Sequence, residues 1–133
     1  MSVVADTSAL YAIVDACDAR HAAALDFARL QAGIESFVVT NYVVSEALSL
    51  VSRRLGMDAA RALQRGALQS SDILWTTPLE HAAGIEAFLA SGRSPSFVDC
   101  ATMATMRSRG LDTIFTFDDD FAQAGFATLP SPA

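Results

Sequence analysis

The sequence predicts an α/β protein with a mostly parallel sheet covered by helices on both faces. Short apolar runs alternate along the chain with longer segments whose apolar residues recur at helical spacing. Such alternation is typical of strand–helix–strand units, and these build parallel sheets that need helices on both sides. No interdomain linker or internal repeat interrupts the 133 residues, so we expect one domain over residues 1–133.

The strands are expected where short apolar runs occur between turn-forming residues. They are Ser2–Ala5, Ser36–Val39, Ile73–Thr76, Thr113–Phe117 and, as an edge strand, Ala127–Leu129. Trp75 ends the apolar part of the third run, so we expect it in the core, with a role at an interface as the alternative.

The helices are expected in the longer segments between the strands. They are Ser8–Val14, Asp18–Ala32, Asn41–Leu55, Asp58–Gln69, Pro78–Ala90, Ser96–Arg109 and Asp119–Ala124. Several ends carry recognisable signals. Asp18 is a candidate N-cap, Pro78 stands near a helix start, and Gly33, Gly56 and Gly110 follow helix ends.

The charge balance limits the classes of function. The chain has a formal net charge of −6, and all nine of its basic residues are Arg. An acidic protein is a poor general binder of nucleic acid, because phosphate contacts need positive charge. Nucleic-acid chemistry remains open only if the negative charge is concentrated at a metal site.

The cysteines and the apolar runs indicate a cytoplasmic protein. Cys17 and Cys100 have no CxxC spacing, so we expect two reduced, buried thiols. No basic-then-apolar leader is visible, and no apolar run approaches the roughly 20 residues of a membrane span.

Four acids stand where a predicted strand ends or a predicted helix begins. Asp6 follows the first strand, Glu46 lies in the second turn of a helix, Asp99 is near the start of another, and Asp118 follows the strand ending at Phe117. The carboxyl ends of parallel strands share one rim, so all four are expected there. Clustered carboxylates repel each other and have raised pKa values unless a cation is bound. Oxygen ligands of this kind suit Mg²⁺ or Mn²⁺.

Each acid also has an ordinary structural explanation. Asp6 could form a turn, and Glu46 could be a partly exposed helix residue. Asp99 stands three residues after Ser96, which is the spacing of a capping box. The acids from Asp118 onward could stabilise a helix N-terminus.

Four motifs resemble those of PIN-domain ribonucleases, in the same order along the chain. They are Asp6-Thr7-Ser8-Ala9-Leu10, Ser45-Glu46, Phe97-Val98-Asp99-Cys100-Ala101 and Thr116-Phe117-Asp118-Asp119-Asp120-Phe121. Length, order and spacing resemble most the VapC-type toxins of bacterial toxin–antitoxin pairs, and the resemblance covers essentially the whole chain.

The resemblance implies a PIN-like, three-layer α/β/α fold with a central sheet of about five strands. It implies an Mg²⁺- or Mn²⁺-dependent endoribonuclease that hydrolyses RNA with a metal-activated water and leaves 5′-phosphate and 3′-hydroxyl ends. Asp6 and Asp99 would be the main metal ligands, and Glu46 and Asp118 would complete the catalytic pocket.

Other residues of the motifs would support these four. The hydroxyls of Ser8 and Thr116 would orient carboxylates. Asp120 is a further candidate acid, which could exchange roles with Asp118 if an extended stretch directs both side chains the same way.

The resemblance also implies partners, namely an RNA substrate, a cognate antitoxin and a second copy in a homodimer. The apolar face of Asn41–Leu55 with Asp58–Gln69 is the expected antitoxin groove. Candidate phosphate contacts are Arg53, Arg54, Arg93, Arg107 and Arg109, with solvated helix ends as their alternative explanation.

The absence of Lys excludes several competing functions. Aspartyl phosphohydrolases, receiver domains and P-loop proteins need a Lys near the phosphoryl group, and this chain has none. Two alternatives stay open: a housekeeping PIN nuclease, and a PIN-fold module that binds partners without cutting RNA.

Overall fold

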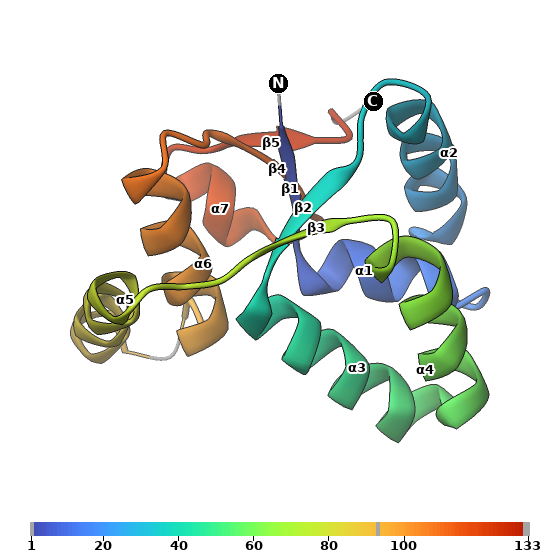
Figure 1. The fold of residues 1–133 in the computed structure, drawn as a ribbon, viewed down its shortest axis with the longest axis horizontal. Helices are drawn as coiled ribbons and strands as arrows, with labels where there is room; N and C mark the ends of the chain where they lie inside the picture. The colour runs from blue at the N-terminus through green and yellow to red at the C-terminus, as the bar shows by residue number, and fades with distance from the viewer. Residues whose placement is uncertain (1, 93, 132–133) are drawn as a thin grey trace.

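The computed structural model describes residues 2–92 and 94–131, which form a five-stranded parallel sheet with helices on both faces (Figure 1). The order across the sheet is β3-β2-β1-β4-β5, and every neighbouring pair is parallel. In chain order the strands are β1 (Val3–Ala5), β2 (Phe37–Thr40), β3 (Asp72–Leu74), β4 (Thr113–Phe115) and β5 (Ala127–Leu129). The predicted α/β class with its parallel sheet of about five strands is confirmed.

The helices of the described chain follow the predicted alternation. They are α1 (Thr7–Val14), α2 (His21–Ala32), α3 (Asn41–Leu55), α4 (Met57–Leu63), the π-helix η1 (Gln64–Leu68), α5 (Pro78–Ser91), α6 (Phe97–Ser108) and α7 (Asp119–Gln123). No helix in the described ranges has both the length and the apolar character needed to cross a membrane.

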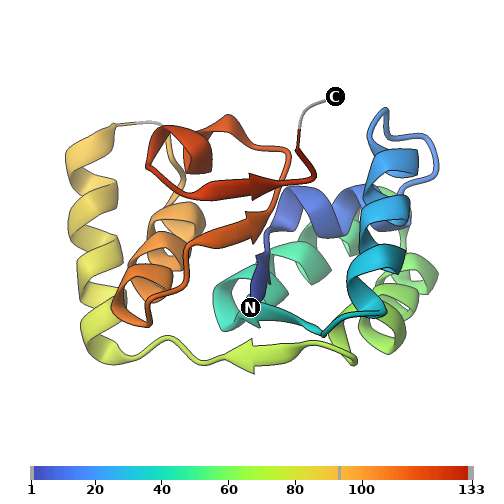
Figure 2. The same cartoon turned by 90° about the horizontal axis from the view of Figure 1, so that it is seen from above.

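Alternating side chains of β1 divide the core into two layers. Val3 and Ala5 join the cluster made with α1 to α4, whereas Val4 points to the opposite face and packs with Met103 and Met106 of α6. A strand buried on both faces has to be apolar throughout, and β1 is. The view from above shows α5 outside α6, so α5 contacts the sheet layer through α6 (Figure 2).

One predicted helix start is wrong for a local reason, and another predicted helix changes type within its bounds. The helix expected from Asp18 begins at His21, because Asp18 accepts a hydrogen bond from the Arg20 amide (2.8 Å) and closes a turn. The His21 ring also bonds to the Ala12 carbonyl oxygen (2.7 Å), which ties the start of α2 to α1. The helix expected over Asp58–Gln69 changes to π-helix at Gln64.

Two expectations about burial are also wrong. Trp75 is 68% exposed, because β3 ends at Leu74 on the edge of the sheet and the chain then leaves the core. Cys17 is exposed in the turn after α1, where its amide donates to Asp15 (3.0 Å). Cys100 is buried, as predicted, and both cysteines are free thiols.

The topology places several segment ends at one rim of the sheet. Helix α1 begins immediately after β1, and α3 begins immediately after β2, with the Thr40 hydroxyl accepting from the Val43 amide (3.2 Å) as N-cap. Helix α7 starts four residues after β4. Side chains at these starts therefore lie at the carboxyl edge of the strands.

Candidate active site

Asp6 is held at the junction of β1 and α1. Its side chain is 2% exposed, and its Oδ2 accepts hydrogen bonds from Ser8 Oγ (3.0 Å) and Thr116 Oγ1 (2.8 Å). Thr116 is 110 positions away in sequence, and the pairing of β1 with β4 brings it there. The predicted hydroxyl partners of this carboxylate are thus in contact with it.

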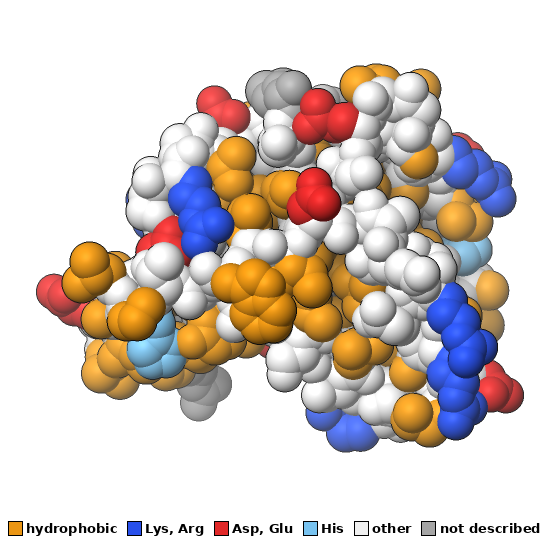
Figure 3. Space-filling model, in the orientation of Figure 1, with side chains coloured by type: hydrophobic (Ala, Val, Ile, Leu, Met, Phe, Trp, Pro, Cys, Tyr) orange, Lys and Arg blue, Asp and Glu red, His pale blue; other side chains and the backbone are white. Residues whose placement is uncertain are grey.

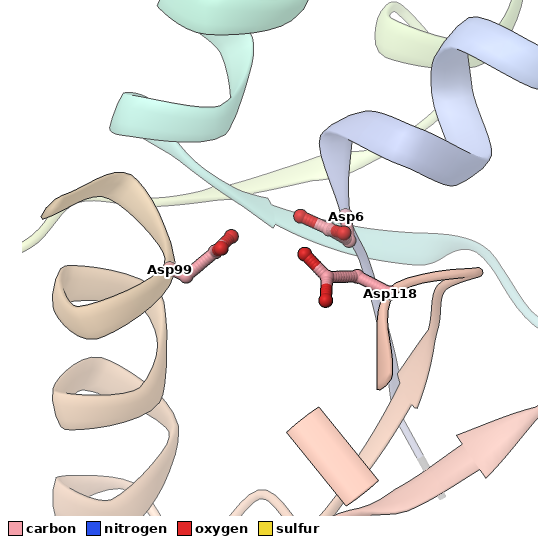
Figure 4. Close-up of side chains that lie close together, drawn as sticks. All are labelled: Asp6, Asp99 and Asp118. Atoms are coloured by element: carbon pink, nitrogen blue, oxygen red, sulfur yellow. The ribbon is translucent and has the colours of Figure 1, made fainter. Parts of the chain in front are cut away.

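Asp99 lies in the first turn of α6, and Ser96 caps that turn. Ser96 Oγ accepts from the Asp99 amide (3.2 Å), so the capping contact uses the backbone of Asp99. The Asp99 side chain is 7% exposed and points toward Asp6 and Asp118 (Figure 4). Ser96 therefore caps the helix as the capping-box spacing suggested, while the Asp99 carboxylate remains available to the site.

Asp118 is the N-cap of α7. Its Oδ1 accepts from the Asp120 amide (2.9 Å), and its own amide donates to Thr116 Oγ1 (3.0 Å). The capping explanation is thus correct for Asp118. It does not remove the residue from the site, because a carboxylate oxygen of Asp118 still lies close to Asp6 and Asp99.

These three carboxylates form one compact group, here called the acidic cluster: Asp6, Asp99 and Asp118. One carboxylate oxygen from each lies within 4.8 Å of the others (Figure 4). Burial raises the pKa of Asp6 above its usual range. Burial, followed by the charges of Asp6 and Asp118, raises the pKa of Asp99 to about 7.

The acidic cluster fits a hard divalent cation. Buried carboxylates with raised pKa values favour a nearby positive charge. Among the described residues no Arg or His lies within ion-pair distance of the three. Oxygen-only ligands from separate segments are the set that Mg²⁺ and Mn²⁺ prefer.

A cavity of about 490 Å³ opens above the acidic cluster. Helix α3 contributes Glu46, Arg53 and Arg54 to its lining. Glu46 is half-buried and stands outside the cluster, but its charge also contributes to the raised pKa of Asp99. The structure therefore brings Asp6, Glu46, Asp99 and Asp118 to one cavity.

Asp120 does not line this cavity. It belongs to α7, and its Oδ2 accepts from Ser94 Oγ (2.5 Å). The expectation of an extended stretch that directs Asp118 and Asp120 the same way is wrong, because α7 begins at Asp119.

The candidate phosphate-binding arginines divide into two groups. Arg53 and Arg54 line the cavity, whereas Arg107 and Arg109 are occupied elsewhere. Arg109 donates to Glu80 and to the Trp75 carbonyl oxygen (2.7 Å), and Arg107 donates to the Ala124 carbonyl oxygen (3.2 Å). Arg93 lies outside the described residues.

Sequence reasoning missed three polar cavity residues: Tyr11, Asp18 and Arg20. Tyr11 stands three positions after Ser8, so helical spacing could have placed both on one face of α1. Asp18 and Arg20 lie in the turn between α1 and α2, where no periodic pattern indicates which way a side chain points.

Comparison with known proteins agrees with this arrangement. Residues 3–127 match the PIN domain family. The chain is 36% identical over 132 residues to the 23S rRNA-specific endonuclease VapC20 of Mycobacterium tuberculosis, in strains CDC 1551 / Oshkosh and ATCC 25618 / H37Rv. That alignment covers 96% of this chain and 97% of the relative.

A solved structure is similar over the same extent. The crystal structure of Mycobacterium tuberculosis VapC20, described as a sarcin–ricin loop cleaving toxin, matches with a TM-score of 0.82 and 32% identity. The match covers 95% of this chain and 97% of that one. By family match, sequence identity and fold, the chain belongs to the PIN-domain family, and its relatives are VapC toxins.

Proposed function

We propose that this protein is an endoribonuclease that depends on Mg²⁺ or Mn²⁺ and acts as the toxin of a type II toxin–antitoxin pair in the cytoplasm. The observation that carries the proposal is the acidic cluster. Three carboxylates from sequence positions 6, 99 and 118 have oxygens within 4.8 Å of one another at a cavity large enough to admit a nucleotide. Apolar packing does not explain why two buried acids and one half-buried acid should lie together, whereas a metal-dependent nuclease requires such a group.

The substrate class is supported by the relatives. A protein 36% identical over nearly the whole chain is named for 23S rRNA cleavage, and its crystal structure is described as a sarcin–ricin loop cleaving toxin. We therefore infer that this chain cuts an RNA loop, with a hairpin of 23S rRNA as the first candidate. Loops are also where bases and backbone are accessible to a protein.

The residues have distinct roles in the proposed reaction. Asp6 and Asp99 would hold the metal, with Asp118 beside them, and Ser8 and Thr116 keep the Asp6 carboxylate in a fixed orientation. A bound Mg²⁺ or Mn²⁺ would supply Lewis-acid stabilisation of phosphate charge and lower the pKa of a water.

Glu46 is the proposed general base, because it faces the cavity without belonging to the acidic cluster. It would take a proton from the water whose oxygen attacks phosphorus. The bond from phosphorus to O3′ then breaks, which leaves a 5′-phosphate and, after protonation, a 3′-hydroxyl.

Cleavage of a labelled hairpin carrying the sarcin–ricin loop of 23S rRNA tests this reaction. With Mg²⁺ or Mn²⁺, Asp6→Asn and Asp99→Asn are expected to abolish cleavage. Asp119→Asn, an exposed neighbour on α7, is the matched control and should cut normally. Asp118→Asn should cost more activity than Asp120→Asn. Unchanged cleavage by Asp6→Asn would contradict the role of Asp6 as a metal ligand. If the wild type cleaved no RNA, a PIN-fold module that binds partners without cutting RNA would be favoured.

Growth assays separate a toxin from a housekeeping nuclease. Expression of the wild type should arrest growth, and co-expression of the adjacent gene product should relieve it. Normal growth of the expressing cells would favour the housekeeping role.

The proposed antitoxin groove is a hollow of about 340 Å³ between α3 and α4. It is lined by Leu48, Ser49, Ser52, Met57, Ala60, Arg61 and Gln64.

The proposed homodimer is supported by apolar side chains on the surface. On one face of the molecule hydrophobic groups gather over β3 and α5 (Figure 3). Trp75 is 68% exposed, Leu79 84% and Leu89 75%.

Light scattering after gel filtration should give twice the chain mass for the wild type. The double variant Trp75→Glu, Leu79→Glu should give a lower mass. A monomeric wild type would remove the homodimer from the proposal.

A further inference from the structure

The arginines of this chain differ in whether they form ion pairs. Arg61 pairs with Asp58, and Arg109 pairs with Glu80. Arg20, Arg53 and Arg54 instead line the cavity above the acidic cluster, and no described carboxylate lies within ion-pair distance of them. Among the described residues, the cavity is therefore lined both by guanidinium groups that form no ion pair and by the carboxylates of the acidic cluster.

Arg20 is the best positioned of the three. Its guanidinium lies over the ring of Phe117, with its carbon 5.4 Å from the ring centroid. The Phe117 amide donates to Ser8 Oγ (3.0 Å), and Ser8 in turn donates to Asp6. The backbone of Phe117 is thus linked to Asp6 through the Ser8 hydroxyl, and Arg20 lines the same cavity as the acidic cluster.

Arg54 has a similar support on another element. Its guanidinium lies over the ring of Tyr11, 5.5 Å from the centroid, and the Tyr11 hydroxyl donates to Asp15 (2.7 Å). A guanidinium over an aromatic ring is attracted by the negative face of that ring. Its planar set of several donors matches the oxygens of a phosphate in a way that the single ammonium group of Lys does not.

We propose that Arg20 binds the RNA phosphate next to the one that is cut, and that Arg54 binds a further phosphate along the same strand. This inference rests on the proposed ribonuclease function and names the residues that hold its substrate. An acidic cavity repels a polyanion, so binding requires local positive charge at defined positions. Two ring-supported guanidinium groups supply that charge with little loss of side-chain freedom when RNA binds.

Salt-dependent binding of a fluorescein-labelled RNA hairpin tests the inference without cleavage. Fluorescence anisotropy is measured in EDTA at KCl concentrations from about 50 to about 200 mM. Over this range the affinity that comes from phosphate contacts falls steeply with salt. Arg20→Gln should weaken binding about threefold to tenfold and reduce the slope of log K against log [KCl] by about 0.7, the contribution of one phosphate contact on a single strand. Arg20→Lys should keep the slope and recover part of the affinity.

Arg107→Gln is the matched control, because Arg107 also lies over a ring, 5.0 Å from the centroid of Phe126, but outside the cavity. Its affinity and slope should equal those of the wild type. Equal losses for Arg20→Gln and Arg107→Gln would show a general charge effect and overturn the inference. So would a wild-type affinity and slope in Arg20→Gln, or a wild type that binds no RNA.

Cleavage kinetics separate this inference from the function on which it rests. In Mg²⁺, Arg20→Gln should raise KM about threefold to tenfold while kcat falls less, because a binding contact away from the reacting atoms is lost. If the wild type cuts no RNA, the proposed function fails and the anisotropy comparison still decides the role of Arg20. If the wild type cuts and Arg20→Gln has an unchanged KM, the inference alone fails.

Discussion

Two hydroxyls connect the ends of β1 and β4 at the proposed metal site. Ser8 donates to Asp6 and accepts from the Phe117 amide, and Thr116 donates to Asp6 and accepts from the Asp118 amide. Each hydroxyl therefore links one buried carboxylate to the backbone that carries another part of the site. A carboxylate held in this way loses little freedom when it binds a metal.

Thr116→Val removes one of these donors with almost no change in side-chain volume. Asp6 would lose the 2.8 Å hydrogen bond, and the Asp118 amide would lose its acceptor. We expect Mn²⁺ affinity to fall about tenfold, as is typical for loss of a group that orients a ligand. Isothermal titration calorimetry measures this change.

Thr102→Val is the control for that experiment. Thr102 is also buried and shares a hydrogen bond with Thr40 (3.2 Å), away from the cavity. Its Mn²⁺ affinity should equal that of the wild type. The same affinity in both variants would mean that Thr116 does not orient the metal ligands.

The residues of the acidic cluster were predictable from sequence because their signal is local. Asp6 and Asp118 follow strands, and Asp99 starts a helix, so each position is set by its own segment. Arg20 gave no such signal. Its place in the cavity depends on the path of a turn and on Phe117, which is 97 positions later in the chain.

At the scale of elements, α5 and α6 approach each other closely at Gly84. A Cβ at this position would lie 2.8 Å from the Ala101 Cα, which is closer than real side chains come. Gly84→Ala should therefore separate the helices and lower the free energy of unfolding by about 1–3 kcal/mol, the usual cost of overpacking. Urea denaturation measures the loss.

Gly66→Ala provides the comparison for that substitution. Gly66 lies in η1, and a Cβ there would meet no atom within 4 Å. Its stability should stay the same or rise slightly, since Ala restricts the unfolded chain more than Gly does. Equal stability of the two variants would mean that α5 and α6 can move apart freely.

Glu80 joins the same two helices through a buried carboxylate. It accepts from Arg109 (2.9 and 3.0 Å), from Ser108 and from the Thr77 amide (2.8 Å), and these contacts hold its pKa at about 2. Arg109 is the largest cause of the lowered pKa. The first turn of α5 is thereby fixed to the end of α6.

The lowered pKa of Glu80 predicts a pH-dependent effect of Glu80→Gln. The folded pKa lies below the unfolded value, so the stabilisation is complete above about pH 4.5 and is lost as pH falls toward 2. Glu80→Gln should cost about 1–3 kcal/mol at pH 7, and the difference should shrink between pH 4.5 and 3.

Urea denaturation at several pH values checks this, with Glu86→Gln on the exposed side of α5 as the control. Glu86→Gln should change stability little at any of these pH values. A difference between wild type and Glu80→Gln that stays constant from pH 7 to 3 would contradict the ionised contact.

The elements themselves were largely predictable, and the two exceptions have different causes. Strands and helices followed from apolar runs and caps. The start of α2 and the end of β3 did not, because side-chain contacts from Asp18 and His21 and the position of β3 at the sheet edge decided them. The apolar run of the third strand did not show that β3 lies at an edge, whereas the edge position of Ala127–Leu129 was predicted.

For the whole molecule, metal binding should be coupled to folding. The acidic cluster exists only when β1, β4 and α6 are assembled, so a cation that binds it stabilises the folded state alone. At a concentration of 100 times Kd this adds about 2.7 kcal/mol. We expect saturating Mn²⁺ to raise the Tm of the wild type by several degrees.

Calorimetric scans of wild type and Asp99→Asn with and without Mn²⁺ measure this coupling. Asp99→Asn should show little rise in Tm, whereas Asp119→Asn, with an exposed side chain outside the cavity, should show the full rise. An equal rise in wild type and Asp99→Asn would place the metal elsewhere.

The sequence by itself determined the α/β class, the alternation of elements, the motif order of the PIN family and the four acids at segment ends. These are local properties, because propensities, caps and apolar runs act over a few neighbouring residues. Only the tertiary structure decided that Asp6, Asp99 and Asp118 approach within 4.8 Å, that Asp120 turns away to Ser94, and that Arg20 joins the cavity while Arg109 does not. Those outcomes depend on strand order and on packing between distant segments, and neither is encoded in any single stretch of the chain.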